Sequence, residues 1–410
     1  MDRAGAGVTA PSGEILFLAH RMPFPPDRGD KIHSHHVLRA LAKIAPVHVG
    51  CFAEDRADWA QEHVLSELAE SYCLRARTKP LALAGLEALV KGAPISLTAF
   101  HDRKLAAWVK ALLATGRIGT IFIFSGQMGQ YVPDDFAGRV ILDLVDVDSA
   151  KFEAYASAGK FPMRWVHARE GHLLRAVETH YARRAQATLL VSQAEADLFS
   201  SRLPPEMSAH VGVLPNGIDC DYFAPGIAAD RAMQVHSGPH LIFTGQMDYP
   251  PNIAAVARVV QRLMPAVLAR YPAARFHVVG RAPTALVRGL HGTNGCIVHG
   301  AVPDVRPYLA GATLALIPLD IARGIQNKVL EAMAMALPCV LSSGAANGIG
   351  ARDGVDYAVA DDDDDLVAAI LTLLADRDAA QAMGQAARHH VLARASWQAA
   401  LAPLADLVTP

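Results

Sequence analysis

Short apolar runs alternate with longer amphipathic stretches along the first half of the chain. The apolar runs have the length of buried β-strands and comprise residues 15–19, 47–52, 121–124, 140–144 and 188–191. The longer stretches have the spacing of helices and comprise residues 33–42, 163–185 and 193–203. Strands that alternate with helices in this way predict a parallel sheet with helices on both faces.

The same alternation restarts in the second half. Its strand-like runs comprise residues 241–243, 275–279, 296–299, 313–319 and 339–341, and its helical stretches comprise 253–269, 305–310 and the residues after Asn327. Turn-forming residues between 214 and 226 predict a linker. We therefore predict an α/β fold with two doubly wound, Rossmann-like domains facing a cleft. The loops at the carboxyl ends of the strands, where such sheets bind ligands, would line both walls.

The 410 residues suffice for two such domains, each with its own core. We predict a short tail at residues 1–13, a first domain at 14–214 and a second domain at 215–390. Residues 391–410 form a final segment with a helical stretch from Trp397 to Leu407.

Composition limits the classes of function. The formal net charge of −2 gives no overall attraction to nucleic acid, so nucleic acid is not an expected partner. The five cysteines are scattered and lack a C-x-x-C pair, which favours a reducing compartment over a disulfide framework. No apolar run reaches the roughly 18 residues of a membrane-spanning helix. We predict a cytoplasmic protein, at most peripheral to the cytoplasmic face of the membrane.

The most informative stretch runs from Arg323 to Ala336 and reads R-G-I-Q-N-K-V-L-E-A-M-A-M-A. It follows a strand-like run, and Gly324 frees the backbone for a tight turn. We predict that Asn327 is the N-cap of the helix that follows. Taken by itself, the stretch is explained equally well as an ordinary surface turn with scattered charges.

The chemistry of this stretch suits phosphates beside a sugar. A helix N-terminus presents unpaired N–H groups and the positive end of the helix dipole, and Arg323 and Lys328 add two cations. Glu331 lies one turn into the helix and suits hydroxyl groups, because an ionised carboxylate only accepts hydrogen bonds. A phosphate site beside a hydroxyl site describes a nucleotide-diphosphate sugar.

Three motifs carry a resemblance to a known family. They are G-I-Q-N-K-V-L-E-A-M-A at 324–334, F-T-G-Q-M-D-Y-P-P-N at 243–252 and L-P-N-G-I-D at 214–219. The first resembles the donor-site signature of the retaining glycosyltransferases of family GT4, which have the GT-B fold. The chain resembles most the sugar transferases associated with PEP-CTERM/exosortase exopolysaccharide systems, over nearly its whole length.

The resemblance implies metal-independent transfer, with retention, of a sugar from a nucleotide-diphosphate sugar to a hydroxyl. The acceptor would be a saccharide or a lipid-linked saccharide in exopolysaccharide biosynthesis, and no cofactor or metal is expected. Residues 14–214 would form the acceptor side and 215–390 the donor side. The last helix would pack back on the first domain.

The resemblance also implies which residues bind the donor. Glu331 would act in catalysis by gripping donor hydroxyls. The predicted donor-binding residues are Gly245, Gln246, Arg281, Val302, Arg323, Gly324, Ile325, Gln326, Asn327, Lys328 and Glu331. The chain departs from the wider family at Gln246, Asn252 and Arg323, where Arg, often Lys, and Glu are usual. We therefore predict that Arg281, Arg323 and Lys328 hold the diphosphate, although a solvent-facing role explains Arg281 alone about equally well.

On the acceptor side, a glycine-containing turn follows the first strand. Arg28, Gly29 and Asp30 resemble the family's loop that meets the acceptor and the departing phosphate. This turn is not G-x-G-x-x-G, which disfavours a nicotinamide-dependent oxidoreductase. Three histidines follow, and we predict that they lie on the helix surface rather than bind a metal; they are His33, His35 and His36.

Three acids follow a later strand at positions 143, 146 and 148. Paired acids suit general acid–base work or Mg²⁺ binding. We predict that Asp146 faces the cleft and serves catalysis by orienting the sugar or the acceptor hydroxyl. Loop capping at a solvated edge explains these acids nearly as well.

Two charged stretches carry weaker signals. The arginine-rich helical stretch 163–185 suits an anionic membrane, but a solvated helix with one buried stripe is favoured slightly. The acids at 361–365 are interpreted as a solvated run at a helix N-terminus. Two rival functions remain open: a non-catalytic sugar-nucleotide-binding protein, motivated by the departures at Gln246 and Arg323, and a sugar-nucleotide epimerase of GT-B fold.

Overall fold

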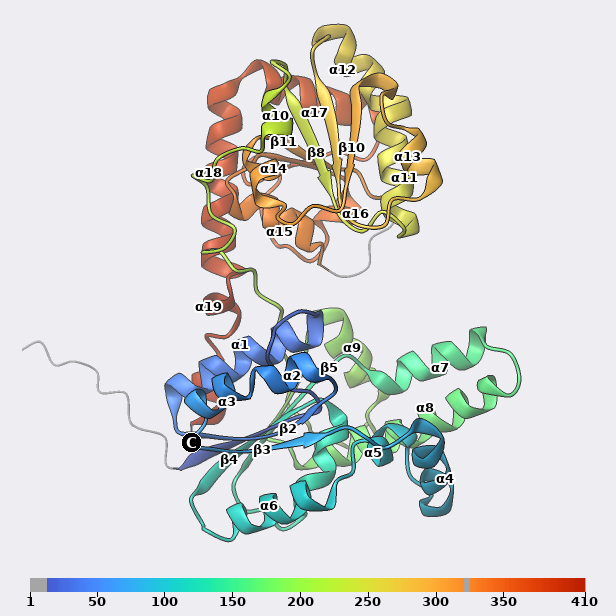
Figure 1. The fold of residues 1–410 in the computed structure, drawn as a ribbon, viewed down its shortest axis with the longest axis vertical. Helices are drawn as coiled ribbons and strands as arrows, with labels where there is room; N and C mark the ends of the chain where they lie inside the picture. The colour runs from blue at the N-terminus through green and yellow to red at the C-terminus, as the bar shows by residue number, and fades with distance from the viewer. Residues whose placement is uncertain (1–12, 321–324, 410) are drawn as a thin grey trace, which may run out of the picture. The chain divides into compact units, whose positions relative to one another are not determined.

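The computed structural model describes residues 13–320 and 325–409, which divide into two compact units (Figure 1). Unit 1 contains the described residues up to Asn216 and those from Leu401 onwards, and unit 2 contains Gly217–Ala400. The chain therefore passes from one unit to the other twice. The sequence placed the corresponding boundaries at 214/215 and 390/391.

Unit 1 is built on a seven-stranded sheet with the order β3-β2-β1-β4-β5-β6-β7. Its neighbouring strands all pair in parallel. The strands are β1 Glu14–Ala19, β2 Val47–Ala53, β3 Ser71–Ala76, β4 Ile118–Phe124, β5 Arg139–Val145, β6 Ala187–Leu190 and β7 Val211–Val213. The central strands are buried along almost their whole length, as expected for a sheet that is covered on both faces.

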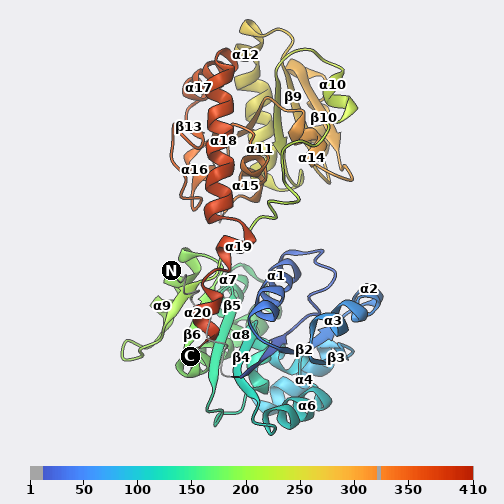
Figure 2. The same cartoon turned by 90° about the vertical axis from the view of Figure 1, so that its left-hand side faces the viewer.

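Helices cover both faces of this sheet. Figures 1 and 2 show α1 on one side of the strands and α6 on the other. The helices of unit 1 are α1 Gly29–Ile44, α2 Arg56–Ala60, α3 Glu62–Leu68, α4 Leu81–Lys91, α5 Ile95–Ala99, α6 Arg103–Leu113, η1 Gly126–Tyr131, α7 Asp148–Ala158, α8 Met163–Arg184, α9 Gln193–Arg202 and α20 Leu404–Val408.

Unit 2 repeats this plan with a six-stranded sheet in the order β10-β9-β8-β11-β12-β13. The strands are β8 His240–Thr244, β9 Arg275–Val279, β10 Cys296–Gly300, β11 Leu314–Ile317, β12 Cys339–Leu341 and β13 Ala358–Val359. The helices are α10 Arg231–Gln234, α11 Pro250–Arg258, η2 Val259–Leu263, α12 Met264–Arg270, α13 Ala285–Gly289, η3 Thr293–Gly295, α14 Arg306–Ala310, α15 Asn327–Ala334, α16 Ser343–Ala346, α17 Asp363–Ala375, α18 Arg377–Arg394 and α19 Trp397–Ala400.

The strand order of each sheet reverses direction next to its first strand. In unit 1 the chain builds outward from β1 through β2 to β3 and then returns to place β4 on the other side of β1. In unit 2 it builds from β8 through β9 to β10 and then places β11 beside β8. Loops that leave the two sides of such a reversal point diverge and open a crevice at the carboxyl ends of the strands, where ligands bind.

The predicted two doubly wound α/β domains are confirmed, and every strand expected from the apolar runs is present. Three strands were missed, namely β3, β7 and β13, because they lie at or near sheet edges and lack a continuous apolar run. The prediction of a single helix from Trp397 to Leu407 was wrong. The structure has two short helices there, and Pro403 precedes the second because it cannot continue the first.

One continuous helical segment, formed by α11, η2 and α12, is long and apolar enough by length and composition to cross a membrane. Its inner face, however, lies in the core of unit 2. Val256, Val259, Leu263 and Val267 are fully buried there. The segment is thus accounted for as the core helix of a doubly wound domain.

Three histidine rings form a hydrogen-bonded row across neighbouring strands of unit 2. His277 lies in the middle, with one ring nitrogen 2.8 Å from His240 and the other 2.9 Å from His299. Burial, together with the smaller repulsion from the neighbouring rings, lowers the pKa of His277 to about 3. His277 is therefore uncharged in the folded protein near neutral pH, and burial lowers the pKa of His240 and His299 as well.

Acid should destabilise unit 2 through this row. Below pH 6.5 an unfolded His277 takes up a proton that the folded ring refuses, so stability is complete above that pH and falls as the pH drops toward 3. At pH 5 the loss should reach about 2 kcal/mol. Scanning calorimetry of the wild type and of His277→Gln, which hydrogen-bonds without titrating, should show a smaller loss between pH 7 and 5 in the variant. Equal losses would contradict the assignment.

Candidate functional site

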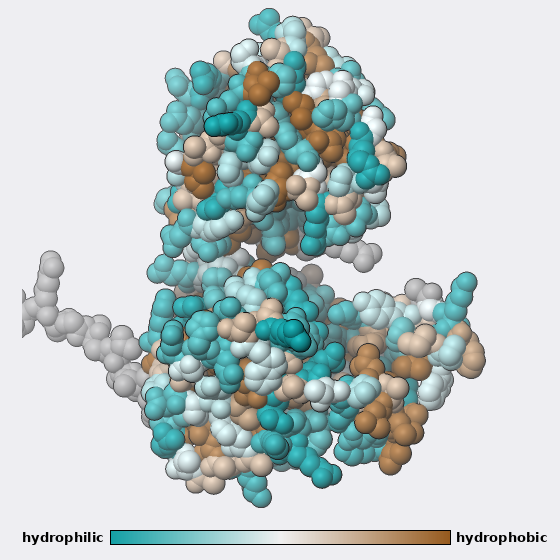
Figure 3. Space-filling model, viewed as in Figure 1, coloured by the Kyte–Doolittle hydropathy of each residue, from teal (hydrophilic) through white to brown (hydrophobic). Residues whose placement is uncertain are grey.

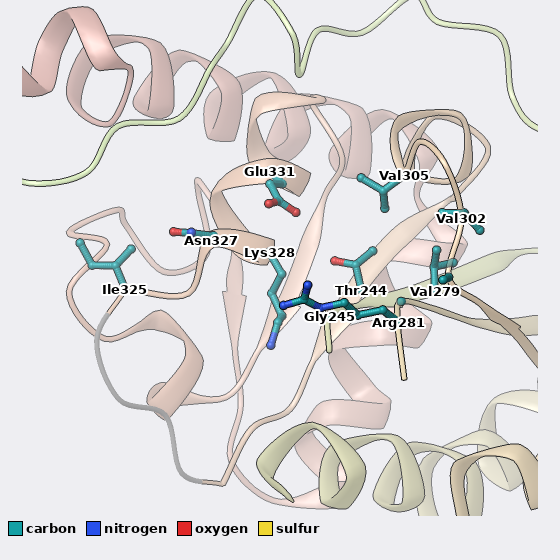
Figure 4. Close-up of a pocket in the computed structure, with 12 residues that line it drawn as sticks. Thr244, Gly245, Val279, Arg281, Val302, Val305, Ile325, Asn327, Lys328 and Glu331 are labelled. Carbon is teal, nitrogen blue, oxygen red and sulfur yellow. The ribbon is translucent and has the colours of Figure 1, made fainter. Parts of the chain in front are cut away.

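A cavity of about 460 Å³ opens at the carboxyl ends of β8, β9 and β10 in unit 2. Its walls come from the residues that follow those strands and from the first turns of α15. The lining residues are Thr244, Gly245, Val279, Gly280, Arg281, Ala301, Val302, Val305, Ile325, Asn327, Lys328 and Glu331 (Figure 4). The cavity lies beside the reversal point between β8 and β11, where a doubly wound sheet binds its ligand.

Two glycines allow the strand ends to form this wall. Gly245 and Gly280 have φ angles of +151° and +156°, which residues with a side chain rarely adopt. A β-carbon on Gly280 would lie 1.6 Å from the carbonyl oxygen of Gly245. Only glycine therefore fits at Gly280, and the backbone itself forms the floor of the cavity.

The cationic side chains of the cavity are held by polar neighbours on the β8 side. Lys328 donates a hydrogen bond to Asn252 Oδ1 at 2.7 Å, and the Asn252 amide in turn donates to the carbonyl oxygen of Gln246 at 2.9 Å. Arg281 donates to the side chain of Gln246 at 3.0 Å. Asn252 is buried, so it fixes Lys328 against the loop that follows β8.

Lys328 and Glu331 lie one turn apart on α15 and influence each other. Burial lowers the pKa of Lys328 to about 8, and the charge of Glu331 opposes that shift. Burial raises the pKa of Glu331, and Lys328 opposes that shift in turn. Figure 4 shows both side chains projecting from α15 on the side of the strand ends. Near neutral pH the cavity thus contains an ammonium group and a desolvated carboxyl group.

The first turn of α15 also faces this cavity. Its N-cap is Gln326, whose side chain does not cap the helix, so the prediction that Asn327 is the N-cap was wrong. Asn327 is instead the first helical residue and is exposed, which leaves its amide group free to face a ligand. The first backbone N–H groups of a helix have no partner within it, and they attract anions.

Most of the predicted donor-binding residues come together here. Gly245, Arg281, Val302, Ile325, Asn327, Lys328 and Glu331 line the cavity, and Gln246 touches Arg281 from its edge. Arg323 and Gly324 lie outside the described residues. Sequence reasoning missed Thr244, Gly280 and the link through Asn252. The position of Thr244 and Gly280 at strand ends was a usable signal. The contact between Asn252 and Lys328 spans 76 residues, and the resemblance marked position 252 without indicating its partner.

Unit 1 has a second cavity, of about 380 Å³, at the carboxyl ends of its own strands. Asp146 and Asp30 both line it. Burial raises the pKa of Asp146, and the nearby Glu195 raises it further. Its wall also includes the aromatic rings of Phe100, Phe124 and Phe152. The cavity can therefore pack apolar or ring faces while its polar groups hold hydroxyls.

Asp30 belongs to a network at the start of α1. Burial would raise the pKa of Asp30, but hydrogen bonds from His20 and Arg21 hold it well below its usual range. Arg28 does not line the cavity and instead donates to Glu54 at 2.7 Å, while Gly29 begins α1. Of the predicted acceptor-side residues, Asp30 therefore lines the cavity, whereas Arg28 and Gly29 do not.

The prediction that the histidines of α1 lie on the helix surface was wrong for His33. Its ring is 1% exposed and contacts Asp143 at 3.1 Å and Asn216 at 2.7 Å. Burial lowers the pKa of His33, but the Asp143 carboxylate outweighs this effect and the net shift is upward. Asp143 is thus a buried partner that ties α1 to β5, and it does not reach the cavity.

The two charged stretches have ordinary partners. In the acidic run, Asp363 pairs with Arg258 and Arg262, and Asp361 accepts from Ser343. In α8, Arg169 donates to carbonyl oxygens at residues 88 and 93, and Arg184 pairs with Asp134. These arginines and aspartates therefore stabilise the fold.

Comparison with known proteins identifies the fold. Residues 238–376 match the family model described as "Glycosyl transferases group 1". A search of curated proteins gave no significant match. Solved structures that resemble the whole chain include Alr3699/HepE from Anabaena in complex with UDP and glucose, with 16% identity, a TM-score of 0.57 and coverage of 96% of this chain and 98% of that one.

Two further structures have the same architecture. Sucrose-phosphate synthase from Thermosynechococcus elongatus shares 18% identity with a TM-score of 0.61 and covers 96% of this chain and 98% of its own. WaaG, a glycosyltransferase involved in lipopolysaccharide biosynthesis, shares 18% identity with a TM-score of 0.55 and covers 96% and 99%. At these identities the likeness establishes the GT-B fold.

The coupling between Lys328 and Glu331 can be measured directly. Glu331→Gln removes the negative charge that supports the ammonium form, so the pKa of Lys328 should fall below about 8, by about one unit. Competitive acetylation followed by mass spectrometry should show Lys328 becoming reactive at lower pH in the variant. Acetylation of Lys43, which lies in unit 1, should be the same in both proteins. An unchanged midpoint for Lys328 would show that the two groups do not interact.

Proposed function

We propose that this protein is a glycosyltransferase that moves a sugar from a nucleotide-diphosphate sugar to a hydroxyl acceptor. The observation that carries the proposal is the composition of the unit 2 cavity. Lys328, Arg281 and the first turn of α15 offer positive charge and N–H donors, while Glu331 offers a hydrogen-bond acceptor. The match of residues 238–376 to group 1 glycosyl transferases supports the same conclusion.

In this proposal the diphosphate lies against the start of α15. The pKa of Lys328 is about 8, so the side chain is mostly protonated near neutral pH and can neutralise a phosphate. Arg281 is exposed and extends from the end of β9, where it can pair with a second phosphate. As the bond between sugar and phosphate breaks, the diphosphate leaves with the electron pair, and preorganised positive groups stabilise that charge.

Glu331 would hold the sugar. Its carboxylate lies one turn beyond the phosphate-binding end of α15, and the desolvation that raises its pKa also strengthens each hydrogen bond that it accepts. Because Lys328 and Arg281 already supply positive charge, the proposed transfer needs no metal. A cavity of about 460 Å³ is within the usual range of small-molecule sites.

The acceptor would bind to unit 1, in the cavity that contains Asp146 and Asp30. We propose that Asp146 orients the acceptor hydroxyl. We also propose retention of the anomeric configuration, membership of family GT4 and a role in exopolysaccharide assembly, all supported by the motifs at 214–219, 243–252 and 324–334. The five free thiols support a reducing, cytoplasmic location.

A thermal-shift screen tests the donor site first. UDP, GDP, ADP, dTDP and their common sugars should be compared, and one nucleotide class should raise the melting temperature, because a ligand that binds only the folded state stabilises it. Arg281→Ala should weaken binding of that nucleotide about tenfold, because a charge-assisted hydrogen bond is lost. Arg270→Ala removes an exposed arginine of α12 and serves as the matched control.

Two outcomes of this screen would contradict the proposed clamp. If no nucleotide changed the melting temperature of a well-folded sample, the proposed donor site would be excluded. Equal weakening in both variants would show that Arg281 contributes only to general charge. The same screen with Arg323→Glu tests the prediction for that residue, and an unchanged donor affinity would exclude it from the diphosphate site.

Glu331→Ala should lower turnover by about a hundredfold or more, because the donor sugar loses the group that holds its hydroxyls. Its melting temperature should stay close to that of the wild type, since Glu331 faces the cavity. Asp364→Ala, which removes an exposed acid of α17, is the control for loss of a carboxylate. Unchanged turnover together with a lower melting temperature would make Glu331 a structural residue.

Assays of the wild-type protein also distinguish the two rival functions. The replacement of the family's usual cation by the neutral Gln246 favours a non-catalytic binder. Donor binding without either hydrolysis or transfer would support that rival. Conversion of the donor sugar without an acceptor and without a glycoside would support an epimerase.

A further inference from the structure

Helix α4 in unit 1 exposes its large apolar side chains and buries small ones, which is the reverse of an ordinary amphipathic helix. The residues that it buries are the small Ala84 and Ala88. Its large apolar residues are exposed, and they are Leu81, Leu83, Leu86, Leu89 and Val90, which we call the α4 surface. Leu81 is 63% exposed and Val90 82%. Figure 3 shows hydrophobic side chains gathered over α4.

Helix α6 of the same unit has the same length and the usual arrangement. It buries Leu105, Val109 and Leu112 and turns Lys104 and Lys110 to solvent. The exposure of the large apolar residues of α4 therefore does not follow from its length. Contiguous exposed apolar patches of this kind mark interaction sites.

Hydrogen bonds fix α4 in this orientation. Thr98 Oγ1 donates to the carbonyl oxygen of Ala84 at 3.0 Å, and Arg169 donates to that of Ala88 at 2.9 Å. Both bonds reach the alanine face from α5 and α8. Turning the leucines inward would break these bonds and force large side chains into a space filled by alanines. The fold therefore holds the leucines of α4 in an exposed position.

A second exposed apolar group lies at the adjoining end of α7 and α8. It consists of Tyr155, Phe161, Met163 and Trp165, of which Phe161 is 87% exposed. Trp165 is one helical turn before Arg169, the residue that ties α8 to α4. The exposed side chains of α4 and of the end of α7 and α8 are thus leucines, a tryptophan and a phenylalanine. Such a composition is typical of a surface that enters the boundary between lipid headgroups and acyl chains.

The charges around these residues favour an anionic lipid surface. Lys160 and Arg164 are exposed between the aromatic residues, and no ion pair is recorded for either within the described part of the chain. The acids nearby are already matched. Glu87 binds Lys79 and Lys91, and hydrogen bonds from both lower its pKa to about 2, while the buried Glu170 accepts from backbone N–H groups of α5.

We infer that the α4 surface and the end of α7 and α8 together dock unit 1 on an anionic lipid bilayer. Elements that pack against this surface line the unit 1 cavity. Ser96 of α5 and Phe152 of α7 line it, and α4 and α8 pack against α5 and α7. Docking would place that cavity beside the headgroups, where the hydroxyl of a lipid-linked acceptor is found. This last step rests on the proposed function; the docking does not.

Vesicle flotation tests the docking without any reaction. The protein should float with vesicles of phosphatidylcholine containing about one third phosphatidylglycerol, and less with pure phosphatidylcholine. Leu86→Glu together with Val90→Glu should lower the partition coefficient by at least about tenfold, because two apolar anchors become charged. The matched control is Val235→Glu together with Leu286→Glu, which changes two exposed apolar residues of unit 2 and should float like the wild type.

Three results would overturn the inference. The first is unchanged flotation of the α4 variant, and the second is an equal loss in the unit 2 control. The third is a dimer in light scattering that the α4 variant dissolves, which would make this surface a contact between copies of the chain. Circular dichroism of both variants shows that each is folded. A nucleotide-induced thermal shift retained by the α4 variant separates failure of docking from failure of the donor site.

The cations have a separate signature. Lys160→Gln together with Arg164→Gln should reduce flotation with anionic vesicles about tenfold and leave weak binding to neutral vesicles unchanged, since each cation near an anionic surface contributes to attraction. Increasing salt should lower the flotation of the wild type with anionic vesicles toward that of this variant. Binding that is insensitive to both lipid charge and salt would contradict the assignment of an anionic surface.

Discussion

A β-carbon on Gly280 would lie 1.6 Å from the carbonyl oxygen of Gly245, so β8 and β9 can end side by side only with glycine at this position. The backbone contact sets the floor of the unit 2 cavity. It also determines where the loop after β8 runs, because Met247 donates to the carbonyl oxygen of Arg281 at 2.8 Å. Asn252 then reaches back to Gln246 and forward to Lys328, so the position of the cation depends on the two glycines.

The electrostatics of the cavity follow from this packing. A lysine in water remains fully charged and hydrated, whereas Lys328 is partly desolvated and lies over the ring of Phe243, with 5.0 Å between Nζ and the ring centroid. Desolvation makes its charge more effective toward a phosphate, because less water competes for it. The same burial raises the pKa of Glu331, and the charge of Lys328 opposes that shift, so each charge supports the ionised form of the other.

Unit 1 uses buried polar pairs where unit 2 uses glycines. Lys31 and Asp58 form a buried ion pair that fixes the start of α1 against α2, and His33 with Asp143 fixes α1 against β5. Removing one partner of such a pair leaves a buried charge and is strongly destabilising. These pairs hold the turn before α1, so that Asp30 faces the cavity. Helix α4, in contrast, packs against the unit through alanines and exposes its leucines.

Local sequence determined the elements and the type of chemistry. Uninterrupted apolar runs such as Ile15–Ala19 have the length of buried strands, and their alternation with helical stretches predicted two doubly wound sheets. The edge strand β3 was missed because most of its residues are only partly buried and no continuous apolar run marks it. In the site, the spacing of Lys328 and Glu331 on one helix was visible in the sequence, because residues three apart share a helix face.

Only the tertiary structure decided which distant residues meet. The contact between Asn252 and Lys328, the burial of His33 by Asp143 and Asn216, and the pairing of Arg281 with Gln246 all join segments far apart in the chain. The orientation of α4 is of the same kind. Its sequence, L-A-L-A-G-L-E-A-L-V-K, has apolar residues on every side, so periodicity alone gives no inner face. Hydrogen bonds from Thr98 and Arg169 to the alanine face turn the leucines outward.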